Sequence, residues 1–373
     1  MTSLTDFYHV DNFIDTFALG HYARVVQATD YRTNTQVAFK VLRPEHLNGT
    51  EEIRWEYRAF PHEADLLTTL AESPHVVQLL DCGYLSTESE VPFSGEIVSF
   101  GTDNVAFREA MEDHAERNWR PYLALENLPR TDNLFYLMKP SQQASRWRLP
   151  SEEGLALALQ FGQLLKHAHS QGIVYLDHKL EHVYWNGSKL QVIDFNSSKK
   201  LETRTGEDQQ FRMDIHNLCV GILYSIFTGL SPQKTTLRPQ PSDMSQVETR
   251  YQDVRSLDFG VEPGLSVALQ DLLQKGAQVQ IESADTFLSE LHAVAALHGW
   301  DFNDQYTSPA SREARDNMRA GIRKLREGQD NVREARALFR EAVILDNITA
   351  DLEDELRRLV KAANDMLNNR VIP

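Results

Sequence analysis

The segment Val174–Asn196 has the sequence VYLDHKLEHVYWNGSKLQVIDFN and contains the charged residues around which the rest of the chain can be interpreted. Its Asn186-Gly187 pair is typical of a tight β turn. The run that follows, Lys189–Asp194, has the alternating pattern and the apolar residues of a strand. Together these features predict a β hairpin that brings Asp194 back over Asp177, near the start of the segment.

Two acids and a neighbouring cation suit phosphoryl transfer. This reaction needs a carboxylate that orients the attacking hydroxyl and accepts its proton, a second carboxylate that holds a metal ion, and a cation against the phosphate oxygens. Asp177 and Asp194 can supply the carboxylates. Lys179 lies two residues beyond Asp177 on an extended loop, so it can reach the migrating phosphate.

The segment resembles the catalytic loop and metal-binding hairpin of the protein kinases. The family frame His-Arg-Asp-Leu-Lys-Pro-Glu-Asn corresponds to Tyr175–His182, and the Asp-Phe-Gly triplet corresponds to Asp194–Asn196. The resemblance implies that Asp177 and Lys179 are catalytic residues and that Asp194 is a metal ligand. It also implies ATP and Mg2+ (or Mn2+) as cofactors.

His182 stands where the family has its metal-binding asparagine. Magnesium prefers oxygen ligands, whereas imidazole suits softer divalent ions. Three interpretations therefore stay open for His182: a weak magnesium ligand, a ligand that favours manganese, or a hydrogen-bonding residue of the loop.

A second resemblance lies near the amino terminus, where the strand Gln36–Leu42 is similar to the Val-Ala-Ile-Lys strand of kinases. The resemblance implies that Lys40 binds the inner phosphates. A helix is expected over Glu51–Glu72, and Glu63 in it is the candidate partner of Lys40, which would otherwise be an unpaired cation near the core. The alternative for Glu63 is a surface acid on an amphipathic helix.

The phosphate-binding loop departs from the family pattern, because Gly20–Val25 has one glycine where kinases use Gly-x-Gly-x-x-Gly. A strand over Phe17–Leu19 is expected before it. Pro121–Leu128 resembles the segment between the two kinase lobes, with Leu125 as gatekeeper. The resemblance implies cofactor-binding roles for Gly20, Val25, Ala38, Lys40, Glu63, Glu126 and Leu128, the last two through backbone atoms that face adenine.

Two helices are expected in the second half of the domain. Ser151–Ser170 is predicted to begin with Ser151 as its cap and with Glu152 and Glu153 complementing the helix dipole. Asp214–Gly229 is apolar on all sides and is predicted to be buried. Asp214 has two interpretations: it holds the backbone of the catalytic loop, as in the family, or it only stabilises the positive end of its helix.

The expected fold class is α+β: a bilobal kinase-like fold with a small antiparallel β lobe plus a helix, a larger helical lobe and a C-terminal helical hairpin. The predicted divisions are an N-lobe at 1–128 with an insertion at 86–120, a C-lobe at 129–300, a linker at 301–311 and an extension at 312–373. In the insertion, Ala106–Asn118 has helical composition. In the extension, Ala335, Phe339 and Ala342 resemble a tetratricopeptide helix, and a plain helical hairpin packed on the large lobe or on a second copy is the alternative.

Composition limits the partners. The net charge of -16 argues against nucleic acid or an anionic membrane as the main partner, but it does not exclude ATP, which needs only a local positive site. Cys82 and Cys219 have no metal-binding or disulfide spacing, so a reducing cytoplasm is expected. No signal peptide is recognisable, and the apolar run Leu218–Leu230 is too short to span a bilayer.

Three functions fit these observations. The first is ATP-dependent transfer to a serine or threonine hydroxyl. The second is a pseudokinase that acts as a nucleotide-responsive binding scaffold. The third is a small-molecule kinase, which would suit the short stretch of nineteen residues between Asp194 and Asp214, where no Ala-Pro-Glu occurs. A protein substrate or partner is expected to bind through the insertion at 86–120 and the C-terminal helices.

Overall fold

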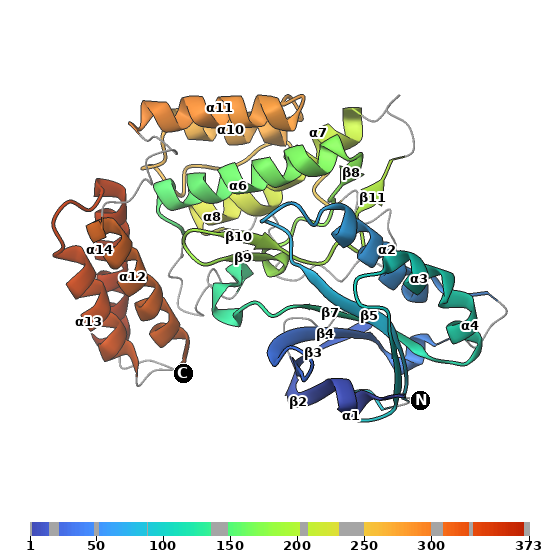
Figure 1. The fold of residues 1–373 in the computed structure, drawn as a ribbon. Coiled ribbons are helices and arrows are strands. Elements are labelled where there is room, and N and C mark those ends of the chain that lie inside the picture. The colour runs from blue at the N-terminus through green and yellow to red at the C-terminus, as the bar shows by residue number, and fades with distance from the viewer. Residues whose placement is uncertain are drawn as a thin grey trace.

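The first part of the chain folds into an antiparallel sheet of seven strands in the order β1-β6-β5-β7-β4-β3-β2 (Figure 1). The computed structural model describes residues 2–14, 22–47, 52–87, 89–135, 148–201, 208–230, 250–299, 309–327 and 331–368. The strands are β1 (Thr2–Ser3), β2 (Tyr8–Ile14), β3 (Ala23–Asp30), β4 (Thr35–Leu42), β5 (Leu79–Ser86), β6 (Glu96–Ser99) and β7 (Arg120–Glu126).

The two faces of β4 have different neighbours. Val37, Phe39 and Val41 are fully buried in the core of the sheet. Because side chains alternate along a strand, Ala38 and Lys40 lie on the opposite face. Helix α2 (Trp55–Thr69) packs against β5 and β7.

The start of the sheet differs from the expectation. The strand that pairs with β3 is β2, which ends at Ile14. The strand expected over Phe17–Leu19 lies outside the described residues, and so does Gly20. A short helix α1 (Leu4–Phe7) and the edge strand β1 precede β2 and were not expected from the sequence.

The insertion forms structure of its own. It contributes β6 to the sheet and two short helices, α3 (Asn104–Glu109) and α4 (Met111–Glu116), where helical composition predicted a helix. Helix α3 contacts α2. The insertion therefore packs on the helix that carries Glu63.

The second lobe is helical, so the α+β two-lobed fold is confirmed. Its elements are α6 (Ser151–Ser170), β8 (Ile173–Val174), β9 (Val183–Trp185), β10 (Leu190–Val192), β11 (Lys199–Lys200), α7 (Asp208–Asn217), a π-helical turn (Leu218–Leu223), α8 (Tyr224–Thr228), α10 (Val267–Ala277) and α11 (Ala284–Leu297). Residues 214–228 are all buried, as expected. Residues 133–139 also have the composition of a short helix, but most of them lie outside the described residues.

In the described residues of the C-terminal extension there are three helices where a hairpin of two was expected: α12 (Pro309–Glu327), α13 (Val332–Val343) and α14 (Ala350–Asn368). Figure 1 shows them beside the helical lobe. Their likeness to a tetratricopeptide repeat stays a prediction, as do the domain boundaries at residues 128, 300 and 311.

The attachment of these helices changes the interpretation of the start of α6. Glu152 and Glu153 are buried, and they pair with Arg315 and Arg319 of α12. The backbone N–H of Ser151 donates to the carboxylate of Asp351 in α14. Ser151 is therefore the first residue of α6 and not its cap, and the two acids mainly bind the extension.

Within the described residues, no helix combines the length and apolar character needed to cross a membrane. Cys82 and Cys219 are buried free thiols.

Candidate active site

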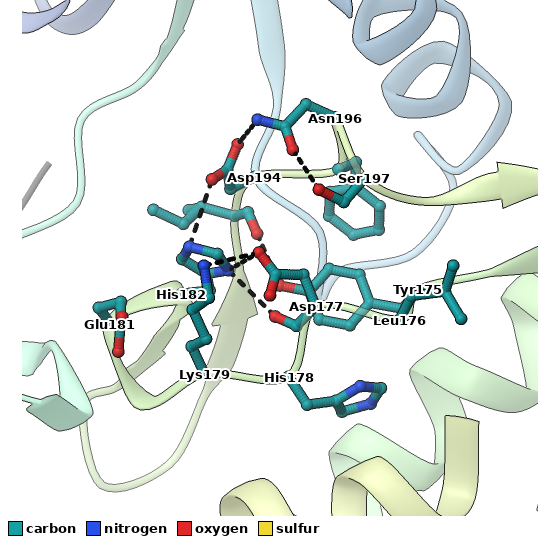
Figure 2. A network of polar contacts seen from close by, with 12 residues as sticks. Tyr175, Leu176, Asp177, His178, Lys179, Glu181, His182, Asp194, Asn196 and Ser197 are labelled. Atoms are coloured by element: carbon teal, nitrogen blue, oxygen red, sulfur yellow. Dashed lines mark hydrogen bonds and ion pairs between the residues drawn. The ribbon is translucent and has the colours of Figure 1, made fainter. Parts of the chain in front are cut away.

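The predicted hairpin forms and positions the two acids. Strands β9 and β10 pair with Leu190 opposite Trp185, and Gly187 takes a φ of 100° in the turn, a backbone conformation that suits glycine. The hairpin returns the chain so that His182 and Asp194, which lie before and after it, face one another (Figure 2). The distance from His182 Nε2 to Asp194 Oδ2 is 3.2 Å.

Asp214 holds the loop that carries Asp177. Its carboxylate is fully buried and accepts hydrogen bonds of 2.8 Å from the backbone N–H groups of Tyr175 and Leu176. Leu176 has a φ of 66°, which is unfavourable for a leucine, so the two bonds stabilise a strained turn. Burial alone would raise the pKa of Asp214, but its hydrogen bond with His169 and the nearby His178 lower it. Of the two interpretations of Asp214, the structure supports the loop-holding one.

Lys40 joins the two lobes. Its Nζ lies 2.7 Å from Glu63 Oε2 in α2 and 2.8 Å from Asp194 Oδ1 after the hairpin. Lys40 and Glu63 are both buried, which excludes the alternative of Glu63 as a surface acid. Although burial opposes it, the charges of Asp194 and Glu63 raise the pKa of Lys40 well above its ordinary value, so the ammonium stays charged.

Asp194 is held in an uncommon backbone conformation, with a φ of 63°. Its Oδ1 also accepts a 2.6 Å hydrogen bond from Asn196, the residue that replaces the glycine of the triplet. Burial alone would raise the pKa of Asp194, but the charges of Lys40 and His182 outweigh burial and lower it. Asp194 therefore carries a negative charge that faces Lys40, Asn196 and His182.

Asp177 is surrounded by cations. Its Oδ2 lies 2.9 Å from Lys179 Nζ and 3.7 Å from His182 Nδ1, and its Oδ1 lies 2.9 Å from Arg250 Nη2. Burial alone would raise the pKa of this carboxyl, but His182, Lys179 and Arg250 lower it. Arg250 was not anticipated from the sequence, because it belongs to no motif and follows Asp177 by 73 residues.

Asp177, His182 and Asp194 form a group that could hold a divalent ion. Each offers one ligand atom, and the three atoms lie within 4.8 Å of one another. His182 Nδ1 lies 3.1 Å from the backbone carbonyl oxygen of Asp177, so when Nδ1 carries the proton, Nε2 faces Asp194 as a possible ligand. The two carboxylates suit magnesium or manganese, whereas the imidazole suits softer divalent ions.

The residues expected on the adenine side line the face of the sheet that carries Lys40. Strands β3 and β4 pair so that Val25 lies opposite Lys40, and Ala38 precedes Lys40 by two residues, which puts all three on one face. Glu126 ends β7 and accepts a 2.7 Å hydrogen bond from the Gln191 side chain of β10. Leu128 is half-buried just beyond it.

A second residue was not anticipated, and it lies close enough to Lys40 to interact with its charge. Tyr22 precedes β3 and is buried, with its ring against Phe60 of α2. Burial raises the pKa of its hydroxyl, which lies in the electrostatic field of Lys40 and Asp194. The sequence showed it only as one position of the glycine-poor loop.

Comparison with known families gives a direct match. A sequence model described as the protein kinase domain matches residues 14–225 of this chain. The match covers the sheet from the end of β2, the catalytic loop, the hairpin and the buried helix, and it ends before Arg250.

Proposed function

Because this chain belongs to the protein kinase family, we propose that it transfers the γ-phosphoryl group of ATP to a serine or threonine hydroxyl. In this proposal Asp177 orients the acceptor hydroxyl and accepts its proton. Lys179, which pairs with Asp177 here, turns to the oxygens of the transferring phosphoryl group. Since the transition state is loose, positioning and charge neutralisation provide most of the catalysis.

The nucleotide side of the site depends on Lys40. Its ammonium would bind the inner phosphates, with Glu63 fixing it from α2. Val25 and Ala38 share its sheet face, so they would contact the adenine, and the backbone of Glu126 and Leu128 would bind the adenine edge.

Asp194 and His182 would hold the divalent ion, Mg2+ or Mn2+, with Asp177 close by. When bound, the ion neutralises phosphate oxygens and orients the γ-phosphoryl group. The chain's contribution is the fixed position of Asp194, which Asn196 and Lys40 both contact.

The single observation that carries the proposal is the ion pair triad of Lys40, Glu63 and Asp194, with both distances below 3 Å. A buried lysine between two acids from different lobes has little value for folding alone, because desolvation offsets most of the attraction. It has a clear use in binding a polyphosphate.

A pseudokinase scaffold is the second candidate, and one observation favours it. Both oxygens of Asp177 contact cations, which lowers the basicity of this carboxylate. On this alternative the nucleotide binds without transfer, and the insertion at 86–120 or the helices α12–α14 recruit a protein partner.

The test is radiolabelled transfer from ATP to a mixed library of serine and threonine peptides, with either Mg2+ or Mn2+. Transfer that is lost in Asp177→Asn supports the kinase proposal. Nucleotide binding in a thermal-shift assay, lost in Lys40→Ala and Asp194→Ala, without transfer to any peptide or to the protein itself, would favour the scaffold. Label that moves only to small metabolites would indicate the small-molecule kinase.

A further inference from the structure

We propose that Arg250 is a positioning residue that holds the carboxylate of Asp177 for the reaction. This inference rests on the proposed kinase function. It concerns a residue beyond the matched kinase domain, which ends at residue 225.

The two oxygens of Asp177 have separate partners. Oδ1 forms a 2.9 Å ion pair with Arg250 Nη2, and Oδ2 forms a 2.9 Å ion pair with Lys179 Nζ. The Asp177 and Arg250 side chains are 4% and 11% exposed, so water competes little for either group. The Asp177 carboxylate thus has a cation on each side, and the contact with Arg250 is an ion pair without hydrogen-bond geometry.

The segment that carries Arg250 is part of the fold beneath the catalytic loop. The hydroxyl of Tyr251 donates a 2.8 Å hydrogen bond to the carbonyl oxygen of His178, next to Asp177. The carbonyl oxygen of Tyr251 lies 2.9 Å from His216 Nε2 in α7. A Cβ at Gly221 would lie 2.6 Å from the Tyr251 ring, so this glycine makes room for the ring.

This anchoring separates the roles of the two cations. Lys179 has a flexible side chain and is the group that turns to the phosphoryl oxygens in the proposed reaction. Arg250 stays on Oδ1, because its neighbour Tyr251 is fixed to the loop. Oδ2 then becomes available to the acceptor hydroxyl, while the charge of the guanidinium opposes rotation of the carboxylate.

The test compares Arg250→Gln, Arg250→Lys and the control Arg255→Gln, an exposed arginine of the same segment. We expect Arg250→Gln to lower kcat for peptide phosphorylation roughly 10- to 100-fold, because misplacement of a reacting group by about 1 Å has that effect. The KM for ATP should change less than about twofold, because Arg250 does not contribute to the nucleotide side. Arg250→Lys should recover part of kcat through its charge, and Arg255→Gln should match the native protein.

Several results would overturn the inference. A higher kcat in Arg250→Gln would show that the guanidinium blocks Asp177, and equal kcat in Arg250→Gln and Arg255→Gln would show that it has no role. If the native protein transfers no more label than Asp177→Asn, the proposed function itself fails. A crystal structure of Arg250→Gln then decides the positioning role: an unchanged Asp177 rotamer contradicts it, and a turned carboxylate supports it.

Discussion

Lys40 is a cation in an otherwise apolar strand, and its buried ammonium needs counter-charges. Glu63 was expected to provide one, whereas Asp194 was expected only as a metal ligand, and its ion pair with Lys40 comes from the structure. Asp177 and Lys179 were fixed by their spacing on one loop. The structure brings these five residues together, although their catalytic roles stay proposals.

Arg250 shows the limit of the same reasoning. Its contact with Asp177 joins residues 73 positions apart, and no local pattern around Arg250 distinguishes it from a surface arginine. The position of Arg250 becomes evident only in the fold, where the hydroxyl of Tyr251 is bonded to the catalytic loop. Long-range ion pairs of this kind depend on the tertiary fold and leave no periodic signal.

Replacing Lys40 with methionine should lower the free energy of unfolding by about 3 kcal/mol, because a buried acid pair loses its cation. The matched control is Lys275→Met, since Lys275 pairs with Glu290 at 2.9 Å on the surface. We expect that change to cost less than about 1 kcal/mol. Urea denaturation of both variants measures the difference, and equal losses would contradict the buried-triad interpretation.

At the scale of elements, the sequence predicted best where one pattern dominates. Helix α6 has the predicted bounds, and the β9–β10 hairpin forms around the predicted turn. Strand β2 (Tyr8–Ile14) was not expected, because its pairing with β3 is not visible in a single segment. The strand expected over Phe17–Leu19 lies outside the described residues.

Asp214 of α7 controls another element, the catalytic loop. In Asp214→Asn one acceptor oxygen is replaced by an NH2 donor. This donor would face either the backbone N–H groups of Tyr175 and Leu176 or the ring of His169. We expect a loss of about 2 kcal/mol in the free energy of unfolding, since buried donors are left without an acceptor.

Hydrogen exchange should show where this loss occurs. The amides of Tyr175 and Leu176 should exchange faster in Asp214→Asn, while the surface control Asp271→Asn in α10 should leave them unchanged. Unchanged exchange at both amides in Asp214→Asn would mean that other contacts hold the loop.

On the scale of the whole molecule, the extension and the kinase domain are joined by buried charges. Arg319 of α12 pairs with Glu153 and donates a 2.9 Å hydrogen bond to the carbonyl oxygen of Trp185, at the end of β9. The sequence predicted helices over both segments, α6 and α12. An acid in the first turn of a helix is already explained by its interaction with the helix dipole, so Glu153 gave no sign of a distant partner. The long-range partner was therefore overlooked.

A second charged cluster at this junction makes the attachment depend on pH. Glu355 of α14 is buried beside Arg148, which also contacts Glu262 and Asp351. Burial raises the pKa of Glu355 to about 7; Arg148 opposes this, and the charges of Asp351 and Glu262 add to it. The cluster has more acids than arginines, so Glu355 is stable there in its protonated form.

The direction of the pH effect follows from the two pKa values. An unfolded glutamate has a pKa of about 4.3, so between that pH and about 7 the folded protein binds the extra proton. The contribution of Glu355 to stability is complete below this window and is lost as the pH rises through about 7. In Glu355→Gln the side chain is neutral at every pH, so this variant should keep the contribution as the pH rises.

Urea unfolding of the native protein and Glu355→Gln at pH 5, 6, 7 and 8 measures this contribution. The free energy of unfolding of Glu355→Gln, relative to that of the native protein, should increase by about 2 kcal/mol from pH 5 to pH 8. The reason is that the native protein releases one proton over roughly two pH units. The stability of Glu353→Gln, a half-buried position of the same helix that pairs with Arg357, should change with pH in parallel with that of the native protein. A Glu355→Gln curve that also runs parallel would mean that Glu355 is ionised in the folded state. Arg148 and Arg358, which lies 2.7 Å from Glu262 and 3.8 Å from Glu355, would then suffice to keep all three acids charged.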